Sequence, residues 1–416
     1  METPQWYKNR EYPHFDKPLS IAAAIKLVEN KQEVEKHAFL PFIKWQITER
    51  RYKRKLHRTG LKCRSIACAA HTDSHIFAYY ASLLNALYEE KLATLDIGDC
   101  VLAYRRFGGK CNIHFAQEAF EHIKSLKSCR VMALDVKGFF DNIDHLLLKK
   151  AWCQLLGVSR LPKDHYVVYK AMTRYAYVNK DALYKEFEIG RRRAAKLKGS
   201  ICSPLEFRTK VRAGNLINVH TDTYGIPQGS PISAVLSNLY LLSFDIALSD
   251  KVKECGGLYR RYSDDILVVC PLFKDCCLDF IKEHLHKLKL DLSEDKTTIT
   301  NLGKDESVTK NTSIQYLGLE LINGQILIRH KAIARYQRRM KESVRSTIRA
   351  ANKAKRKGST GEAYKRKLYE RFTHLSKNSS YPQYIKRASR ITSSEAITKQ
   401  HRNHWQQLHD LLKHRR

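Results

Sequence analysis

The residues with the clearest chemical potential are two adjacent aspartates, Asp264 and Asp265, in the stretch RRYSDDILVV (Arg260–Val269). Apolar residues lie on both sides of the pair, and the aliphatic and β-branched run that follows it is typical of a buried strand. The pattern therefore predicts a hairpin whose tip carries both carboxylates. A third carboxylate, Asp135, directly follows the apolar run Val131–Leu134 and so ends another predicted strand. Like charges at the end of a buried strand are costly unless a cation offsets them.

If these strands are neighbours, three carboxylates converge, and Mg²⁺ is the expected counter-ion because it prefers oxygen ligands. Two Mg²⁺ ions about 3.5–4 Å apart stabilise the attacking and leaving oxygens of a phosphoryl transfer. We predict Asp135, Asp264 and Asp265 as catalytic metal ligands, with the Val136 carbonyl as a further oxygen ligand. Mn²⁺ is expected to substitute for Mg²⁺. Taken alone, these residues also fit a polar hairpin turn and a helix cap.

The charge of the chain points to a polyanionic partner. The 416 residues contain 75 Lys+Arg against 42 Asp+Glu, a net charge of +33. These basic residues are spread along the whole chain, which favours nucleic acid over an anionic lipid surface. No apolar run approaches the roughly 20 residues that cross a membrane, and the first residues form no apolar signal segment. We expect no membrane partner and a cytoplasmic location.

The eleven cysteines form no CxxC pair, so the sequence predicts no zinc site. An odd number of cysteines without a secretion signal fits a reducing compartment.

Hydrophobic periodicity and turn residues outline the elements that must position these side chains. In the first half of the chain, we predict helix over 19–60, helix over His71–Leu92, a buried strand and turn over Val131–Phe140, and helix over His145–Gly157. A long irregular basic insertion is predicted over 180–222, followed by a glycine/proline loop and amphipathic helix over Gly225–Leu248. The remaining predictions are a helix over Asp279–Leu290, strands over Thr297–Asn301 and 313–328 with a turn at Asn323–Gly324, and basic helices over His330–Arg416.

Five stretches, taken in order, resemble the motifs of the reverse transcriptases, and specifically the prokaryotic ones. They are LDVKGFFDNIDH (Leu134–His145), YGIPQGSPISAVLSN (Tyr224–Asn238), YSDD (Tyr262–Asp265), DLSEDKTTI (Asp291–Ile299) and QYLGLEL (Gln315–Leu321). The resemblance covers roughly residues 40–330. It implies an α+β right-hand polymerase, with fingers and an antiparallel-sheet palm over 1–330 and a basic helical thumb or RNA-binding region over 331–416. The implied activity is that of an RNA-directed DNA polymerase, a nucleotidyltransferase that uses dNTPs.

The resemblance also implies roles for single residues. Arg64 matches the position whose guanidinium holds the incoming triphosphate, and a planar fork suits phosphate oxygens. Gln228 is expected to support the nucleotide or the template, and Lys296 to protonate the leaving pyrophosphate. An ordinary surface arginine and a solvated lysine remain the alternatives for Arg64 and Lys296. The expected primer grip is formed by Tyr316, Leu317 and Gly318.

Phe140 lies five residues after Asp135 and is expected to exclude ribonucleotides, because its ring would occupy the space of a ribose 2′-hydroxyl. RNA-dependent RNA polymerases typically place an aspartate at that offset, whereas Asp141 comes one residue later here. The neighbouring Phe139 is the alternative for this role, because one of the two rings is expected to belong to the core and the sequence does not distinguish them.

Three further stretches are similar to the unknown-group, defence-associated reverse transcriptases of bacteria, and most to their second type. They are YPHFD (Tyr12–Asp16), LKCRSIACAAHTDSHIFAYYA (Leu61–Ala81) and AYRRFGGKCNIHFAQEAF (Ala103–Phe120). That likeness implies a structured noncoding RNA as template and scaffold, a repetitive cDNA product and a role in antiphage defence.

Several alternatives remain. A retron enzyme is one, although its usual VTG is VTK (Val308–Lys310) in this chain. Group II intron enzymes usually carry a maturase region, which is not evident after His330. An untemplated or protein-primed nucleotide polymeriser, an RNA polymerase and an RNA-binding protein with a retired active site are the others. The sequence leaves the priming mechanism, the identity of the template RNA and the oligomeric state open.

Overall fold

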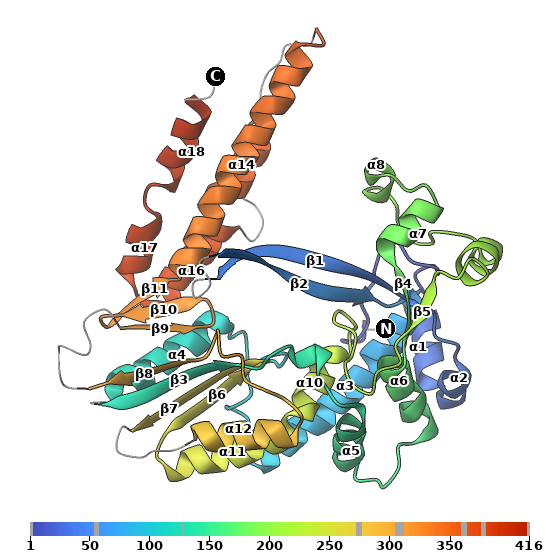
Figure 1. Cartoon of the computed structure of the whole chain (residues 1–416), viewed down its shortest axis with the longest axis horizontal. Helices are drawn as coiled ribbons and strands as arrows, with labels where there is room; N and C mark the ends of the chain where they lie inside the picture. Colours follow the sequence, from blue (N-terminus) through green and yellow to red (C-terminus); the bar gives the residue numbers. More distant parts are fainter. Residues whose placement is uncertain are drawn as a thin grey trace. The chain divides into compact units, whose positions relative to one another are not determined.

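The computed structural model describes residues 3–53, 58–126, 128–271, 277–303, 312–358, 364–375 and 380–413 (Figure 1). The chain forms two compact units, each assembled from separate stretches. Unit 1 comprises Met1–Tyr104, Val136–Asp250 and Leu278–Leu292, and unit 2 comprises Arg105–Asp135, Lys251–Cys277 and Ser293–Arg416. Val308–Lys310, which distinguish the chain from the retron enzymes, lie outside the described residues.

The first strands of unit 1 lie where the sequence predicted helix. Only α1 (Ile21–Glu29) and α2 (Lys31–Lys36) are helical, and Ser20 and Asn30 cap them through their side-chain oxygens. The chain then forms the antiparallel pair β1 (Phe42–Lys53) and β2 (Arg58–Cys68), so helix over 19–60 is wrong for its second half. Aromatic and β-branched residues at the start of β1 favour a strand. The basic residues that follow favour neither a helix nor a strand clearly.

The sheet of unit 1 has the strand order β2-β1-β4-β5. β4 (Ala176–Asn179) pairs in parallel with β1 and in antiparallel with β5 (Ile217–Val219).

The stretch over 180–222 is more ordered than the sequence predicted. It contains α7 (Lys180–Glu186), α8 (Arg191–Ala194), α9 (Pro204–Glu206), a π-helical turn over Phe207–Arg212, and β5. Each helix has seven residues or fewer, which is too short to leave a clear periodic pattern in the sequence. Phe207 and Val211 nonetheless anchor the stretch, because both are buried in a core shared with Ile43 of β1 and Leu183 of α7.

The helices of unit 1 pack around α3 (His71–Thr94), which contacts α1, α5 (His145–Leu156), α6 (Lys163–Thr173) and α10 (Ser233–Tyr240). Asp16 secures the start of α3, because its carboxylate accepts backbone hydrogen bonds from His71 and Thr72 at 2.9 and 2.8 Å. The helices predicted over 71–92 and 145–157 are confirmed by α3 and α5. The loop and helix predicted over 225–248 are confirmed by a loop that leads into α10, which α11 (Leu242–Glu254) follows. α12 (Leu278–Lys287) confirms the helix predicted over Asp279–Leu290.

Unit 2 is built on an antiparallel sheet of order β6-β7-β3-β8. Its strands are β3 (Cys129–Asp135), β6 (Leu258–Tyr262), β7 (Asp265–Pro271) and β8 (Thr298–Leu302). A second sheet has the order β11-β10-β9, with β9 (Ser313–Tyr316), β10 (Leu319–Ile322) and β11 (Gln325–Ile328). The helix α4 (Asn112–Ser125) and both sheets share one apolar core. The predicted strands of this region are confirmed.

The remainder of unit 2 is helical, as predicted. Its helices are α14 (His330–Lys355), α15 (Arg366–Phe372), α16 (Tyr381–Thr392), α17 (Glu395–His401) and α18 (His404–Lys413). Tyr336, Met340 and Val344 of α14 pack against α15 and α18 in a separate small core. The mixture of helices with antiparallel sheets confirms the expected α+β class. Within the described residues, every helix is too short or too polar to span a membrane.

Candidate active site

Two of the three predicted catalytic aspartates lie opposite each other in unit 2. Asp135 is the last residue of β3 and Asp265 the first of β7, and the antiparallel register pairs them directly. Side chains of directly opposed residues leave the same face of a sheet, with Cβ atoms roughly 4.5–5.5 Å apart. Asp264 immediately precedes β7 and forms a two-residue turn with Ser263. The residues on either side of this turn, Tyr262 of β6 and Asp265 of β7, are paired with each other. The structure thus brings all three aspartates to one end of the β6-β7-β3-β8 sheet.

The backbone of this turn is held by a buried arginine that the sequence analysis did not single out. Ser263 has a φ of +59°, in the left-handed region that non-glycine residues rarely adopt. The Arg261 side chain is fully buried, and its Nη1 donates a hydrogen bond to the Ser263 carbonyl at 3.1 Å. Side chains alternate along a strand, so Arg261 lies on the same inward face as the buried Tyr259. A charged residue at an inward position was the sequence feature that could have identified Arg261 as a structural residue.

The electrostatics of the cluster follow from the crowding of like charges. Desolvation and the repulsion of Asp264 and Asp135 raise the pKa of Asp265 to about 6. Asp265 remains exposed by surface area, so an ion from solvent can reach it. Asp135 is nearly buried, at 7% exposure, and its Oδ1 accepts a short hydrogen bond from the Lys296 ammonium. Lys296 therefore acts in this structure as a counter-ion for Asp135.

The donor set suits Mg²⁺, which binds through carboxylate and carbonyl oxygens and seldom requires an all-protein cage. Val136 directly follows Asp135 in the chain and forms a backbone bridge with Leu292 within unit 1. No group of three or more His, Cys, Asp or Glu in the described part of the chain has the geometry of a ready metal site. In this structure an oxygen of Asp135 is already paired with the Lys296 ammonium.

Tyr316, Leu317 and Gly318, the predicted primer grip, form the tight turn between β9 and β10. Leu317 and Gly318 have φ values of +43° and +90°, as in the type I′ turns that commonly connect the two strands of a hairpin. The Leu317 carbonyl accepts a hydrogen bond from Asn112 Nδ2 at 2.9 Å, an interaction that the sequence analysis missed. Tyr316 is buried, and both this burial and the charge of Asp265 raise its pKa. Because β9 also contacts β3, the turn belongs to the same unit as the three aspartates.

The predicted nucleotide-binding residues Arg64, Phe140 and Gln228 belong to unit 1. Arg64 lies on β2, where its Nη1 is 3.6 Å from Glu49 Oε2 across the hairpin. Near the end of the same strand, Ala67 N donates to the Gln228 carbonyl at 2.8 Å. Gly229 has a φ of +113°, and a Cβ there would lie only 2.8 Å from the Ala67 carbonyl oxygen, so this close approach requires glycine.

The same loop is bound to the segment that carries Phe140. Gln228 Nε2 donates to Asp141 Oδ1 at 3.4 Å, and Ile226 N donates to the Phe140 carbonyl at 3.0 Å. Phe139 is buried at 3% exposure, whereas Phe140 is only partly buried. The structure therefore assigns Phe139 to the core and leaves part of the Phe140 ring accessible.

Comparison with known proteins identifies the class of the chain. Residues 76–321, more than half of the sequence, match the family described as "Reverse transcriptase (RNA-dependent DNA polymerase)". The chain belongs to this family, as its motifs predicted. The matched range includes the three aspartates, Gln228 and the β9–β10 turn. No curated protein matches the chain.

Solved polymerase structures are similar at low identity. An apo telomerase from Candida tropicalis, truncated from its C-terminal domain, matches with 11% identity and a TM-score of 0.41, over 74% of this chain and 60% of that one. The RNA-dependent RNA polymerase of a human picorbirnavirus matches with 10% identity and a TM-score of 0.39, over 68% and 43%. The Candida tropicalis telomerase in complex with a fragment of telomeric RNA matches with 13% identity and a TM-score of 0.39, over 92% and 58%. The chain spans at most 60% of the length of these three structures.

Proposed function

We propose that the protein copies RNA into DNA by nucleotidyl transfer at the end of the β3 and β7 strands. The observation that carries this proposal is the direct pairing of Asp135 with Asp265, with Asp264 on the adjoining turn. These carboxylates would hold two Mg²⁺ ions, with the Val136 carbonyl as a further ligand. The bound ions would activate the primer hydroxyl and offset the charge that develops on the leaving pyrophosphate.

The chain's own residues supply the remaining functions in this proposal. Arg64 binds the triphosphate and Gln228 supports the nucleotide or the template. Phe140 excludes a ribose 2′-hydroxyl. Lys296, whose ammonium pairs with Asp135 in this structure, is the proposed proton donor to the leaving pyrophosphate.

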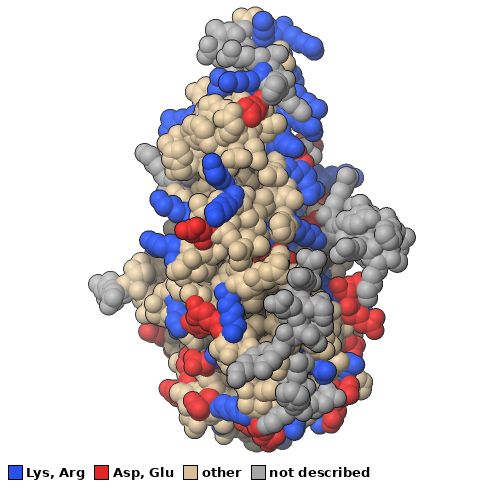
Figure 2. All heavy atoms as spheres, turned by 90° about the vertical axis from the view of Figure 1, so that its left-hand side faces the viewer, with Lys and Arg blue, Asp and Glu red and all other residues tan. Residues whose placement is uncertain are grey.

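We assign residues 1–330 to fingers and palm and residues 331–416 to a thumb that also binds RNA. The primer grip in this assignment is the turn of Tyr316, Leu317 and Gly318. The charge of the C-terminal helices supports it, since α14 carries nine Lys or Arg residues and a single acidic residue, Glu342. Among the charged side chains on the upper part of the face in Figure 2, Lys and Arg are more frequent than Asp and Glu.

The proposed template is a structured noncoding RNA that also serves as a scaffold, and the proposed setting is antiphage defence in the cytoplasm. Two observations support this: the net charge of +33 and the likeness of the motifs to defence-associated enzymes. A primer–template duplex alone needs only part of this charge. Sequencing the nucleic acid that purifies with the protein from its native host tests the template. A heterogeneous pool of cellular RNA would contradict a dedicated partner.

Purified protein, incubated with its co-purifying RNA and with either dNTPs or NTPs, tests the polymerase assignment. cDNA complementary to the bound RNA is the expected product. A homopolymer would indicate untemplated synthesis, an RNA product would indicate an RNA polymerase, and no product from any substrate set would contradict catalysis altogether. The Asp264→Ala/Asp265→Ala protein is the control for a contaminating polymerase.

A further inference from the structure

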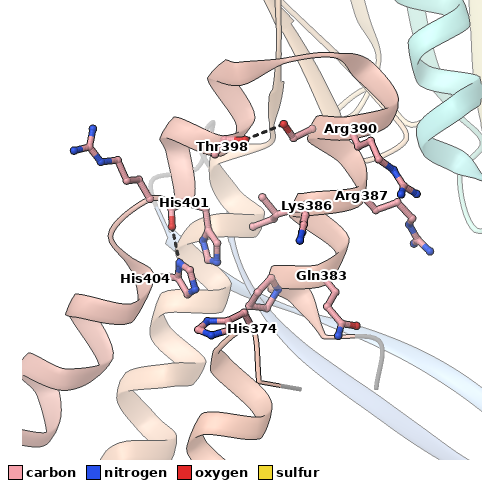
Figure 3. A pocket seen from close by; sticks show the side chains of 12 residues that line it. His374, Gln383, Lys386, Arg387, Arg390, Thr398, His401 and His404 are labelled. Carbon is pink, nitrogen blue, oxygen red and sulfur yellow. Dashed lines mark hydrogen bonds between the residues drawn. The ribbon is translucent and has the colours of Figure 1, made fainter. Parts of the chain in front are cut away.

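A groove of about 880 Å³ lies along α16 and α17 in unit 2, remote in sequence from the aspartates (Figure 3). Pro382 and Ile385 give it an apolar wall, and Gln383, Ser389 and Thr398 add polar groups. A volume of this size accommodates one or two nucleotides and lies within the range of ordinary ligand pockets.

The charge of the groove is of one sign. Its lining includes Lys386, Arg387, Arg390 and Arg402, and no Asp or Glu among the residues that the structure describes. All four cationic side chains are exposed, and none forms an ion pair with a described acidic residue. Figure 3 shows Arg387 and Arg390 at one edge of the groove and Lys386 nearer its centre. This arrangement suits a ligand that carries more than one negative charge.

Two histidines at the same groove have unsatisfied nitrogens. The rings of His401 and His404 stack at 4.1 Å with an interplanar angle of 8°. His404 Nδ1 is 2.8 Å from the His401 carbonyl, which can only accept, so Nδ1 carries the proton and neutral His404 has a free lone pair at Nε2. The Nε2 atoms of both rings are buried without a hydrogen-bond partner in the described structure. His401 is itself only 9% exposed.

A buried polar atom without a partner is destabilising, so two of them beside one groove favour a ligand that would satisfy them. Burial and the neighbouring His404 lower the pKa of His401 to about 4, so this ring is neutral at physiological pH. A neutral imidazole carries no positive charge, and its Nε2 atom is a donor or an acceptor according to the tautomer, beside the aromatic face of the ring. These are the interactions that a nucleobase makes with protein.

We propose that this groove binds an unpaired RNA nucleotide, whose base contacts the His401–His404 pair while flanking phosphates contact Lys386, Arg387, Arg390 and Arg402. The cationic side chains suit the phosphates and the apolar wall suits the base. The proposal rests on the proposed function only in taking RNA as the partner, and it specifies an anchoring site for a single-stranded part of that RNA.

The first test needs no variant. A short oligouridylate that carries 5-iodouridine is irradiated with the full-length protein, and the cross-linked peptides are identified by mass spectrometry. Cross-links to the segment 381–404 are expected. Cross-links confined to other parts of the chain would overturn the proposal.

The second test separates base from phosphate. Fluorescence anisotropy compares a fluorescein-labelled oligouridylate with an abasic ribose-phosphate strand of the same length. The wild-type protein should prefer the intact strand by about tenfold, the usual contribution of one stacked base. His401→Gln should reduce this preference and leave the affinity for the abasic strand unchanged. An unaltered preference, or equal competition by polyglutamate, would count against a base in the groove.

The third test concerns the binding of phosphates. Arg387→Gln/Arg390→Gln should flatten the dependence of log affinity on log salt by roughly 0.7 for each phosphate that is no longer neutralised. The matched control is Lys163→Gln/Lys170→Gln, which removes two exposed cations from α6 of unit 1. Equal slopes for the two proteins would overturn the assignment. Primer extension on the same proteins separates this inference from the proposed function. A variant with a reduced preference for the intact strand and normal extension would show that the groove binds a base without taking part in catalysis. A wild-type protein that binds RNA here and never extends a primer contradicts only the polymerase.

Discussion

Asp135 and Asp265 lie directly opposite each other in the antiparallel strands β3 and β7, and both end the sheet on the same side. Their carboxylates are therefore close because of the register, and a slip of one residue would send one of them to the other face. Lys296 neutralises Asp135 in this structure, while the charges of Asp264 and Asp135 still raise the pKa of Asp265. The cluster stores electrostatic strain that a bound cation would relieve, and the first three predictions follow from this.

Removal of the two adjacent carboxylates should separate catalysis from folding. We expect Asp264→Ala/Asp265→Ala to abolish DNA synthesis while thermal stability without metal holds or rises, because like-charge repulsion is relieved. Primer extension in Mg²⁺ and thermal melting in EDTA measure the two effects. Asp279→Ala/Glu283→Ala removes two exposed carboxylates from α12 and should change neither. Normal extension by the Asp264/Asp265 variant would refute the active-site assignment.

The stability contribution of Asp265 should depend on pH. Its pKa is raised to about 6 in the folded protein, so folding favours the protonated form and the aspartate becomes destabilising as pH rises from about 4 through 6. Asp265→Asn should thus stabilise the metal-free protein at pH 7–8, by about 1 kcal/mol after allowance for solvent screening. The gain should shrink below pH 6 and vanish below about pH 4. Denaturant unfolding in EDTA across this range checks it, and a gain independent of pH would contradict the charge-crowding explanation.

Lys296 and a metal ion should substitute for each other as partners of Asp135. We expect Lys296→Gln to lower the melting temperature in EDTA, because a nearly buried carboxylate loses its cation. Mg²⁺ should narrow the difference from the wild type, and Lys296→Arg should behave nearly like the wild type in EDTA. Melting curves over a Mg²⁺ titration provide the measurement. If the difference in melting temperature between the wild type and Lys296→Gln does not change with Mg²⁺, the lysine and the metal act at different places.

The two neighbouring phenylalanines should have separable effects. Phe139 is 3% exposed, so Phe139→Ala should destabilise the protein by about 3–5 kcal/mol. Phe140→Ala should cost less stability and admit ribonucleotides much more readily, because the partly accessible ring is the one free to meet a sugar. Single-nucleotide incorporation of dNTP against NTP is the readout. Relaxed sugar choice in the Phe139 variant alone would shift the assignment by one residue.

The C-terminal helices should bind RNA beyond what extension requires. Arg338, Arg345 and Arg349 of α14 are exposed, and their replacement by Gln should weaken RNA binding more than it slows extension on a supplied primer–template. The slope of log affinity against log salt should fall by roughly 0.7–0.9 for each phosphate that the variant no longer neutralises. Parallel binding and extension measurements decide the matter, and equal reductions in both would favour a thumb that grips only the duplex.

The sequence by itself predicted the aspartate hairpin, because an aliphatic run follows the SDD directly and the polar SDD interrupts the apolar and aromatic residues on either side. It also predicted α3, α5 and the largely helical character of the C-terminal region. It failed at β1 and β2, where a basic, charge-rich stretch has no clear period and the pairing between strands decides the conformation. It likewise failed over 180–222, where short capped helices depend on a shared core rather than on local propensity.

Only the tertiary structure decided which strands are neighbours, and so placed Asp135 beside Asp265 across 130 residues of chain. It alone revealed Arg261 behind the turn, Asn112 on the Leu317 carbonyl, and the difference in burial between Phe139 and Phe140. Those facts depend on register and packing, which arise from interactions between residues far apart in sequence. Local sequence patterns specify elements and their chemical groups, whereas the distances between those groups are set when the elements bury their apolar faces against one another.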